Sequence, residues 1–290
     1  MLDFTIIIYY CDIIFKRILK FFGELFMSVI KNCKRIVVKI GTSTLTYQNG
    51  SLNLRRIEAL VRTISDFKNA GHEVVMVSSG AVGAGYARLG LESYPDTLAR
   101  KQACAAVGQS QLMKIYENFF GEYGHTVAQI LMTKDVIDNP HRLELVRNTF
   151  RTLIDMKCIP IVNENDSVSS EEMQFGGNDT LSAYVGIACD ADLIINLSDI
   201  DGLYDKDPRK NPDAKLIDRV EEINDEIRSY AGGAGTNRGT GGMIAKIKAA
   251  SIATNMGIPM LIINGENPFI LYEILDGKHV GTYFAGRKDN

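Results

Sequence analysis

The chain has 290 residues, of which 46% are hydrophobic, and its formal net charge is -3. This length can form one large α/β domain or two small ones, and the balanced charge argues against nucleic acid as the main partner. The 5 cysteines and 4 histidines are scattered along the chain. Their spacing argues against a disulfide framework, a zinc site and a catalytic triad, and it favours a reducing, cytoplasmic location.

Residues 1–26 differ in character from the rest of the chain. They are rich in Ile, Phe and Tyr, but aspartates interrupt the apolar run, which is shorter than the ~18 residues of a membrane span. The segment also lacks the features of a secretory signal. It could be an extra helix, a membrane-surface helix, or the product of a start codon placed too early. The last reading is favoured, so we expect the functional domain at 27–285 and a short tail at 286–290.

The domain begins with two strand-to-loop units. Residues 35–40 (RIVVKI) predict a buried strand that ends at Gly41. Lys39 is a charge near the end of that strand, which is costly unless it faces a ligand or an anion; the alternative is a side chain that reaches solvent. Asn53 can cap the helix that follows, and residues 73–77 predict a second strand that leads into SSGAVGAG. This small-residue helix start is either an anion cradle or a site of tight helix packing.

The middle of the chain continues the alternation. Residues 96–121 predict a long helix, with Gly108 as a candidate break. Residues 127–131 predict a strand, and the Asn-Pro pair at 139–140 is typical of a helix start. A strand at 159–162 is followed by NENDSV, whose polar side chains lie where ligands bind in open α/β sheets, although a simple polar turn would read the same way.

Further strand ends and helix starts follow. GGNDT predicts a helix start with Asn178 or Asp179 as its cap. Residues 192–197 predict a strand, which Ser198 and Asp199 follow, and residues 214–217 predict a short edge strand. The carboxyl ends of such strands gather polar groups at one edge of a parallel sheet.

Residues 232–250 (GGAGTNRGTGGMIAKIKAA) form a glycine-rich loop that leads into a helix. Free N–H groups and the helix dipole favour an anion at such a helix start, and Lys246 lies one turn inside; the alternative is an ordinary surface loop. Residues 258–264 predict the last long strand. The expected apolar face of the helix carries Met243, Ile244, Ile247 and Ala250, with Lys246 and Lys248 off that face.

Strands and helices alternate from 35 to 284 without a linker or a repeat, which predicts one α/β domain on a mostly parallel sheet. Lysines, glycine amides and hydroxyl groups follow several of the strands, and such groups suit a phosphate. Phosphoryl transfer needs alignment and positive charge more than covalent help from the protein. The sequence contains no Walker A motif and no protein-kinase motif set.

Six segments, in order, carry a more specific resemblance: VVKIGTS, VSSGAVGAG, AAVGQSQL, IVNENDSV, LSDIDGLYDKDPR and GTGGMIAKIKAA. Each is weak by itself, but together, from Lys34 to about Phe284, they resemble the amino acid kinase family. Within that family they are similar to the members that phosphorylate glutamate. The resemblance implies a three-layer αβα sandwich on a mostly parallel central sheet, with two lobes around a cleft.

The resemblance also implies the chemistry. ATP and Mg²⁺ would convert L-glutamate to L-glutamyl 5-phosphate, at the start of proline biosynthesis. Lys39 and Lys246 would stabilise charge on the transferring phosphoryl group, and Asp179 would hold both lysines. Glutamate would be held by Ser79, Asp166 and Asn178. The nucleotide would be bound by Lys39, Ser198, Asp199, Thr240, Gly241, Gly242, Met243, Ile244, Ala245 and Lys246. No residue is assigned to the metal.

The chain departs from the family pattern in two ways. Many members carry an acid at the position of Gly177, so any role of that acid is in doubt here. Many bacterial members also have a C-terminal RNA-binding-like domain, which we do not expect in this chain. Family members assemble as dimers or tetramers and are inhibited by proline. The resemblance therefore implies a homodimer or homotetramer with proline as a feedback inhibitor.

Other readings stay open. The chain could be an acetylglutamate, aspartate, carbamate or uridylate kinase of the same fold. It could be a catalytically silent protein that binds nucleotide or amino acid as a regulator, although such a protein would be expected to have lost Lys39, Lys246 or Asp179. It could also be an enzyme docked on a membrane through residues 1–26. We expect neither a nucleic-acid partner nor a membrane partner.

Overall fold

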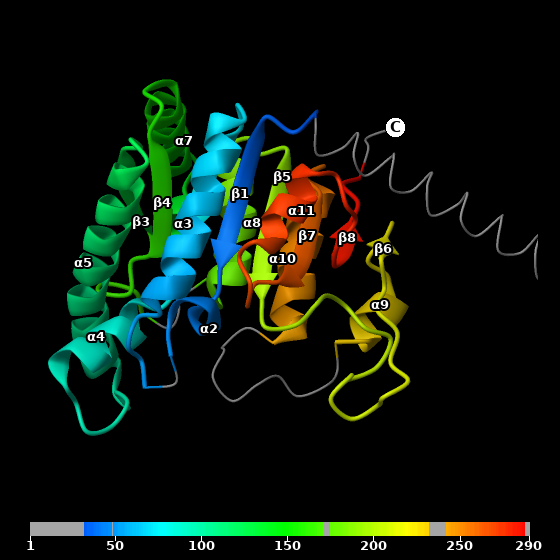
Figure 1. Ribbon diagram of the computed structural model, residues 1–290, viewed down its shortest axis with the longest axis horizontal. Coiled ribbons are helices and arrows are strands. Elements are labelled where there is room, and N and C mark those ends of the chain that lie inside the picture. Colours follow the sequence, from blue (N-terminus) through cyan, green and yellow to red (C-terminus); the bar gives the residue numbers. More distant parts are fainter. Residues whose placement is uncertain (1–31, 48, 171–174, 232–241, 288–290) are drawn as a thin grey trace, which may run out of the picture.

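The computed structural model describes residues 32–47, 49–170, 175–231 and 242–287. In these ranges the chain forms one eight-stranded sheet with the order β3-β4-β2-β1-β5-β7-β8-β6 (Figure 1). Neighbouring strands are parallel except for β7 and β8. The strands are β1 (Arg35–Ile40), β2 (Glu73–Val77), β3 (Val127–Met132), β4 (Ile159–Glu164), β5 (Leu193–Ser198), β6 (Arg219–Val220), β7 (Met260–Asn264) and β8 (Thr282–Phe284).

Helices cover both faces of the sheet, as expected for a three-layer αβα fold (Figure 1). Side chains of α3, α5 and α11 build the core on one face, and side chains of α7, α8 and α10 build it on the other. The helices are α2 (Thr42–Leu45), α3 (Leu54–Asn69), α4 (Ala81–Leu89), α5 (Leu98–Glu122), α6 (Lys134–Asp138), α7 (Pro140–Asp155), α8 (Asn178–Ala188), α9 (Asp225–Ser229), α10 (Met243–Asn255) and α11 (Ile270–Leu275).

Strand β1 shows how the two faces are specified. Ile36 and Val38 belong to the core on the α3 side, whereas Val37 belongs to the core on the α8 and α10 side. Side chains alternate along a strand, so Lys39 must point to the same side as Val37. The register of β1 therefore directs a lysine toward α8 and α10.

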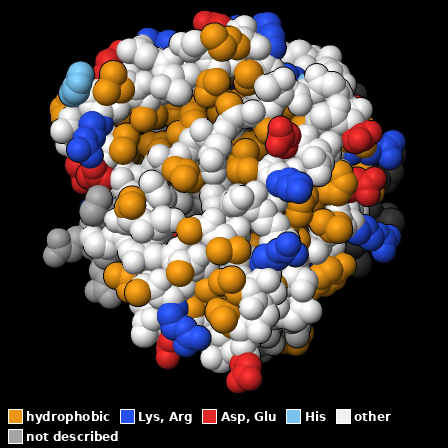
Figure 2. All heavy atoms as spheres, turned by 90° about the vertical axis from the view of Figure 1, so that its left-hand side faces the viewer, with side chains coloured by type: hydrophobic (Ala, Val, Ile, Leu, Met, Phe, Trp, Pro, Cys, Tyr) orange, Lys and Arg blue, Asp and Glu red, His pale blue; other side chains and the backbone are white. Residues whose placement is uncertain are grey.

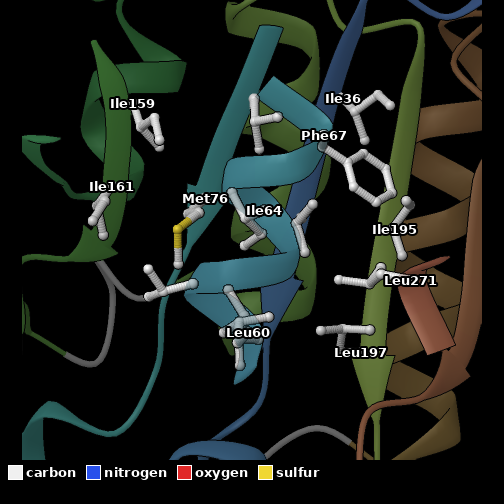
Figure 3. Packing of buried hydrophobic residues seen from close by; sticks show 14 of the residues in the cluster. Ile36, Leu60, Ile64, Phe67, Met76, Ile159, Ile161, Ile195, Leu197 and Leu271 are labelled. Atoms are coloured by element: carbon white, nitrogen blue, oxygen red, sulfur yellow. The ribbon is translucent and has the colours of Figure 1, made fainter. Parts of the chain in front are cut away.

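Helix α3 covers the opposite face with an apolar stripe. Figure 3 shows Leu60, Ile64 and Phe67 pointing from this helix toward the sheet, and all three are fully buried. Their spacing of three and four residues places them on one side of an α-helix. Asn53 begins the helix as predicted, because its side chain accepts a hydrogen bond from the backbone N–H of Arg56.

Most predicted strands and helices are confirmed within a few residues, but two predictions were wrong in detail. Residues 214–217 form no strand; Leu216 makes an isolated bridge with Tyr204, and the edge strand is β6. Gly108 does not break α5, which runs unbroken from Leu98 to Glu122. A glycine in a helix can serve close packing instead of a bend.

Gly108 lies where α5 crosses the start of α4. A Cβ atom at this position would lie only 1.8 Å from the carbonyl oxygen of Ala81, which is a backbone atom that cannot rotate away. The same crossing admits no Cβ on Gly85, where it would lie 1.8 Å from the carbonyl oxygen of Cys104. The two glycines therefore allow α4 and α5 to approach to backbone contact.

Replacing Gly108 with alanine is expected to lower the free energy of unfolding by about 3 kcal/mol, because the two helices must separate to admit the methyl group. Urea unfolding followed by circular dichroism measures the change. Gly121→Ala is the matched control on the same helix, since a Cβ there meets nothing within 4 Å. That variant should be neutral or gain up to ~1 kcal/mol; equal losses in both variants would contradict the packing role of Gly108.

Among the described residues, no helix is both long enough and apolar enough to cross a membrane. Residues 1–26, for which the sequence left three interpretations open, lie outside the described ranges.

Candidate active site

The carboxyl ends of the parallel strands meet at the lower edge of the sheet in Figure 1. Lys39 lies near the end of β1, Ser78 and Ser79 follow β2, Asn163 lies near the end of β4, and Ser198 ends β5. All five are buried despite being polar. Open parallel sheets bind ligands at this edge, so the fold brings together most of the groups that the sequence singled out.

Two lysines from opposite ends of the chain meet one carboxylate here. Lys39 Nζ lies 2.5 Å from Asp179 Oδ1, and Lys246 Nζ lies 3.2 Å from Asp179 Oδ2. Lys39 is 5% exposed, Lys246 is 7% exposed and Asp179 is 3% exposed. Each ammonium has three N–H donors and gives one of them to Asp179. The predicted Lys39–Asp179–Lys246 cluster therefore exists, and it concentrates positive charge in a site shielded from water.

Burial and charge together set the ionisation of this cluster. Burial alone would raise the pKa of Asp179, but the ammonium groups of Lys39 and Lys246 hold it below its usual value. Burial lowers the pKa of Lys39; Asp179 opposes this effect and Lys246 adds to it. Asp179 thus remains a carboxylate at neutral pH and acts as the shared counter-ion of the two lysines.

Asn196 is a member of the cluster that sequence reasoning missed. It lies in β5 directly beside Lys39 of β1, is fully buried, and donates from Nδ2 to Asp179 Oδ1 at 2.9 Å. This bond helps to fix the orientation of the carboxylate. The signal was present in the sequence, since an amide inside the apolar run LIINLS needs a buried partner.

The first turn of α8 divides its side chains between two tasks. The helix begins at Asn178 with Gly177 at the cap position and no side-chain cap, so the predicted cap by Asn178 or Asp179 was wrong. Gly177 has φ 111° and ψ 159°, a conformation open to glycine alone. Asn178 and Asp179 are drawn away from capping because both side chains bond to other elements. The N–H groups of the first turn remain available to an anion.

Asn178 turns toward the loop after β2. Its Nδ2 lies 2.7 Å from the carbonyl oxygen of Ser78, 2.9 Å from Ser79 Oγ and 3.1 Å from Asn163 Oδ1. Among the described residues, no donor is paired with Asn178 Oδ1. Ser79 and Asn178, two of the predicted substrate residues, are thus in direct contact, and an acceptor atom of Asn178 is left for a ligand.

Asp166, the third predicted substrate residue, lies in the loop after β4. Burial raises the pKa of its carboxyl group to about 6, and within the described ranges it has no hydrogen-bond partner. Its neighbour Glu164 is buried differently, because Glu164 Oε1 accepts from Ser169 Oγ and from the backbone N–H of Phe175, both at 3.2 Å. Glu164 therefore holds the loop in shape, whereas Asp166 presents a carboxylate that has no cationic partner within the described ranges.

The predicted nucleotide residues are only partly described. Ser198 Oγ lies 3.2 Å from Asp199 Oδ1 at the end of β5, and Asp199 is close enough to Lys39 to influence its pKa. Gly242 precedes α10, and Met243, Ile244, Ala245 and Lys246 form its first turn. Thr240 and Gly241 lie outside the described residues.

The predicted apolar face of α10 was wrong at two positions. Ile244 is 65% exposed, whereas Lys246 is buried. The helix is rotated from the apolar pattern because the Lys246 ammonium gains Asp179, and this contact offsets the cost of burying the charge. Lys248, by contrast, is exposed as predicted.

The sequence profile described as Amino acid kinase family matches residues 34–264. The chain belongs to the amino acid kinase family. The family assignment agrees with the mostly parallel sheet and with the kinase chemistry that the six segments implied.

Several relatives carry one enzyme name. Glutamate 5-kinase of Clostridium perfringens is 57% identical over 263 residues, covering 89% of this chain and 98% of that protein. Glutamate 5-kinase of Clostridium tetani is 54% identical, covering 89% and 97%. Among solved structures, the UMP kinase of Bacillus anthracis aligns with a TM-score of 0.61 at 18% identity, covering 88% of this chain and 97% of that one. At that identity the structural likeness supports the fold alone.

Proposed function

We propose that this amino acid kinase transfers the γ-phosphoryl group of ATP to the side-chain carboxylate of L-glutamate. The products are L-glutamyl 5-phosphate and ADP, and the reaction is the first step of proline biosynthesis. Relatives named Glutamate 5-kinase, which are 57% and 54% identical over nearly their whole length, support this activity. An acetylglutamate, aspartate, carbamate or uridylate kinase and a catalytically silent regulator are the alternatives to test.

The arrangement that carries this proposal lies at the start of α8. Asn178 contacts Ser79, whereas its neighbour Asp179 contacts Lys39 and Lys246. One helix start therefore places a group of polar side chains beside a positively charged cluster. A substrate held by Asn178 and Ser79 would have its carboxylate next to a phosphoryl group held by Lys39 and Lys246. Phosphoryl transfer requires this alignment of acceptor and phosphoryl group.

The chemical step follows from this alignment. A carboxylate oxygen of glutamate forms a bond to the γ-phosphorus of ATP, while the bond from that phosphorus to the bridging oxygen breaks and ADP leaves. The nucleophile is already ionised, so the step needs no general base. Lys39 and Lys246 stabilise the charge on the transferring group, and Asp179 keeps both ammonium groups in place.

Glutamate is held by Ser79, Asp166 and Asn178 in this proposal. The carboxylate of Asp166 is part-buried and lacks a partner within the described ranges, so it is suited to the α-ammonium group of an amino acid. Asn178 Oδ1 offers a second acceptor, and Ser79 Oγ offers a hydroxyl. Binding a cation would also lower the raised pKa of Asp166.

Asp166→Asn is expected to raise the KM for glutamate about tenfold or more and to change kcat little, because it removes a charge-assisted hydrogen bond to the substrate. In the parent protein, kcat/KM for glutamate should fall as the pH drops below about 6, since the raised pKa of Asp166 leaves its carboxyl group neutral there. That fall should disappear in the variant.

The control for this variant is Asp155→Asn, which alters an exposed carboxylate at the end of α7. It should leave both the KM and the pH profile unchanged. Initial rates at several glutamate concentrations between pH 5 and pH 8 measure both. An unchanged KM in Asp166→Asn would remove Asp166 from the substrate site.

The nucleotide is proposed to lie against Ser198, Asp199 and residues 240–246. Mg²⁺ usually binds through one or two carboxylates together with substrate phosphates. Asp199, at the end of β5 and near Lys39, is the carboxylate best placed to join the phosphates of ATP in holding the ion. When bound, Mg²⁺ would neutralise charge on those phosphates.

Assembly, regulation and location are proposed as well. We infer one kinase domain over residues 27–285 that works in the cytoplasm as a homodimer or homotetramer and is inhibited by proline.

Figure 2 shows the face at the β3 end of the sheet, where hydrophobic side chains gather in patches. Leu98, Leu131 and Leu145 are exposed large hydrophobic residues on α5, β3 and α7, the elements at this end. Light scattering tests the assembly, and added proline tests the inhibition.

The experiment that tests the activity supplies ATP and Mg²⁺ with glutamate, acetylglutamate, aspartate, carbamate or UMP in separate reactions. Hydroxylamine is included to trap an acyl phosphate as a hydroxamate. ADP together with a hydroxamate is expected with glutamate alone. Turnover with another acceptor would assign the chain to a different substrate within the family, and no turnover with any acceptor would favour the regulator.

A further inference from the structure

A line of hydrogen bonds connects the proposed substrate residues to helix α5. Gln109 Oε1 accepts from Asn163 Nδ2 at 2.8 Å. Asn163 Oδ1 in turn accepts from Asn178 Nδ2 at 3.1 Å, and Asn178 Nδ2 lies 2.9 Å from Ser79 Oγ. Gln109 is therefore the far end of a network whose near end consists of two proposed substrate residues.

Gln109 contributes to the orientation of the Asn163 amide. Asn163 uses Oδ1 to accept from Asn178 and, at 2.9 Å, from the backbone N–H of Glu164. Its Nδ2 needs an acceptor, and Gln109 Oε1 provides it. If the Asn163 amide turned over, its NH₂ group would face the NH₂ group of Asn178 and the backbone N–H of Glu164, and its oxygen would face Gln109 Oε1, so three hydrogen bonds would be lost. Gln109 Oε1 thus acts together with the donors of Asn178 and Glu164 to exclude that orientation.

Burial raises the free-energy cost of the wrong orientation of the Asn163 amide. Gln109 is 8% exposed and Asn163 is 2% exposed. Water cannot readily replace a lost partner at such positions, so an unpaired amide there costs more than at the surface. The amide of Asn163 is thus held by protein contacts, and through it the side chain of Asn178 is held as well.

Contacts of helix α5 with neighbouring elements hold Gln109 in position. The neighbouring Gly108 packs directly on Ala81 at the start of α4, which follows the Ser78-Ser79 loop. Farther along α5, the hydroxyl of Tyr116 bonds to Ser78 Oγ at 3.0 Å. On either side of Gln109, helix α5 therefore contacts Ser78 and the helix start at Ala81, and these two contacts fix the position of Gln109 relative to Ser79.

We propose that Gln109 is a positioning residue that sets the affinity for glutamate by orienting Asn163, and through it Asn178 and Ser79. Among the described residues, the Gln109 side chain is hydrogen-bonded to Asn163 and not to Lys39, Asp179 or Lys246, so its effect falls on the acceptor and not on phosphoryl transfer. The inference rests on the proposed function, because it assumes that Asn178 and Ser79 hold the substrate.

The test replaces Gln109 with methionine, which keeps the length of the side chain and removes the acceptor. The KM for glutamate should rise about tenfold, which corresponds to the loss of roughly one buried hydrogen bond, while kcat and the KM for ATP stay within about twofold. Gln109→Asn is a milder second variant, because its shorter amide cannot reach Asn163. It should change the same constant in the same direction.

Gln111→Met is the matched control, since Gln111 lies on the same helix, is part-buried, and does not contact Asn163. It should keep the parent KM. The rise in melting temperature on adding glutamate is measured for each variant against the same variant without glutamate, which separates affinity from stability. That rise should shrink in both Gln109 variants and persist in Gln111→Met.

The outcomes separate this inference from the proposed function. If the parent protein forms no hydroxamate from glutamate, the proposed function fails. If the parent protein turns over glutamate and both Gln109 variants keep its KM and its glutamate-induced rise in melting temperature, the positioning role is overturned. A variant that lowers kcat without changing the KM for glutamate would overturn it too, because that result would place Gln109 with the phosphoryl-transfer cluster.

Discussion

Lys246→Ala is expected to lower kcat by about a hundredfold or more while leaving the KM for glutamate nearly unchanged. Lys246 enters the site from the first turn of α10, and its ammonium shares Asp179 with Lys39. Charge on the transferring phosphoryl group grows in the transition state, so a buried ammonium acts mainly there. The residues proposed to hold glutamate lie on the Asn178 side of the site and would be untouched.

Lys248→Ala is the control that the helix itself provides. Lys248 lies two residues farther along α10 and is exposed, whereas Lys246 is buried. The control should keep the parent kcat, which would rule out a general effect of removing positive charge from this helix. Initial-rate kinetics with ATP and glutamate varied in turn measure both constants. A Lys246→Ala protein with near-normal kcat would exclude Lys246 from the catalytic set.

The sequence was informative where local patterns decide the structure. The β-branched run at 35–40 and the cap at Asn53 gave the correct elements, because a buried strand and a helix start depend on neighbouring residues. Lys39 was predicted to face a ligand or an anion because a charge in an apolar strand needs a partner. The partner is Asp179, 140 residues away along the chain, which no local pattern could identify without the family resemblance.

The sequence was less informative where long-range contacts override local preference. Asn178 and Asp179 are good helix caps, yet both leave that task to bond with Asn163 and the two lysines. Lys246 is buried and Ile244 exposed for the same reason, since one ion pair decides how α10 is turned. These two failures of local reasoning, at the starts of α8 and α10, therefore lie in the candidate site, where polar contacts determine side-chain positions.

Asp179→Asn is expected to lower the free energy of unfolding at pH 7 by about 3 kcal/mol and to reduce kcat strongly. The carboxylate is 3% exposed and neutralises two lysines that are almost as deeply buried. The asparagine keeps the shape of the side chain but removes the charge, so two buried ammonium groups lose their shared counter-ion. Urea unfolding at several pH values measures the loss of stability.

The pH dependence distinguishes a lost counter-ion from poorer packing. Burial already lowers the pKa of Lys39, and the loss of Asp179 lowers it further. The unfolded chain keeps this lysine protonated up to about pH 10.4. At pH values between the folded-state pKa and the unfolded-state pKa of Lys39, raising the pH therefore favours the folded state of the variant, in which Lys39 is neutral. The loss of stability caused by burying charged Lys39 is complete at pH values below its folded-state pKa, and it declines at higher pH.

The stability gap between the parent protein and Asp179→Asn should accordingly be largest near neutral pH and narrow toward pH 9. Asp155→Asn, which removes an exposed carboxylate, should show no such gap at either pH. An Asp179→Asn gap that stays constant with pH would mean that packing or hydrogen bonding, and not the charge of the two lysines, is what Asp179 stabilises. A gap that narrows would identify Asp179 as the counter-ion that lets two cations remain buried beside the phosphoryl site.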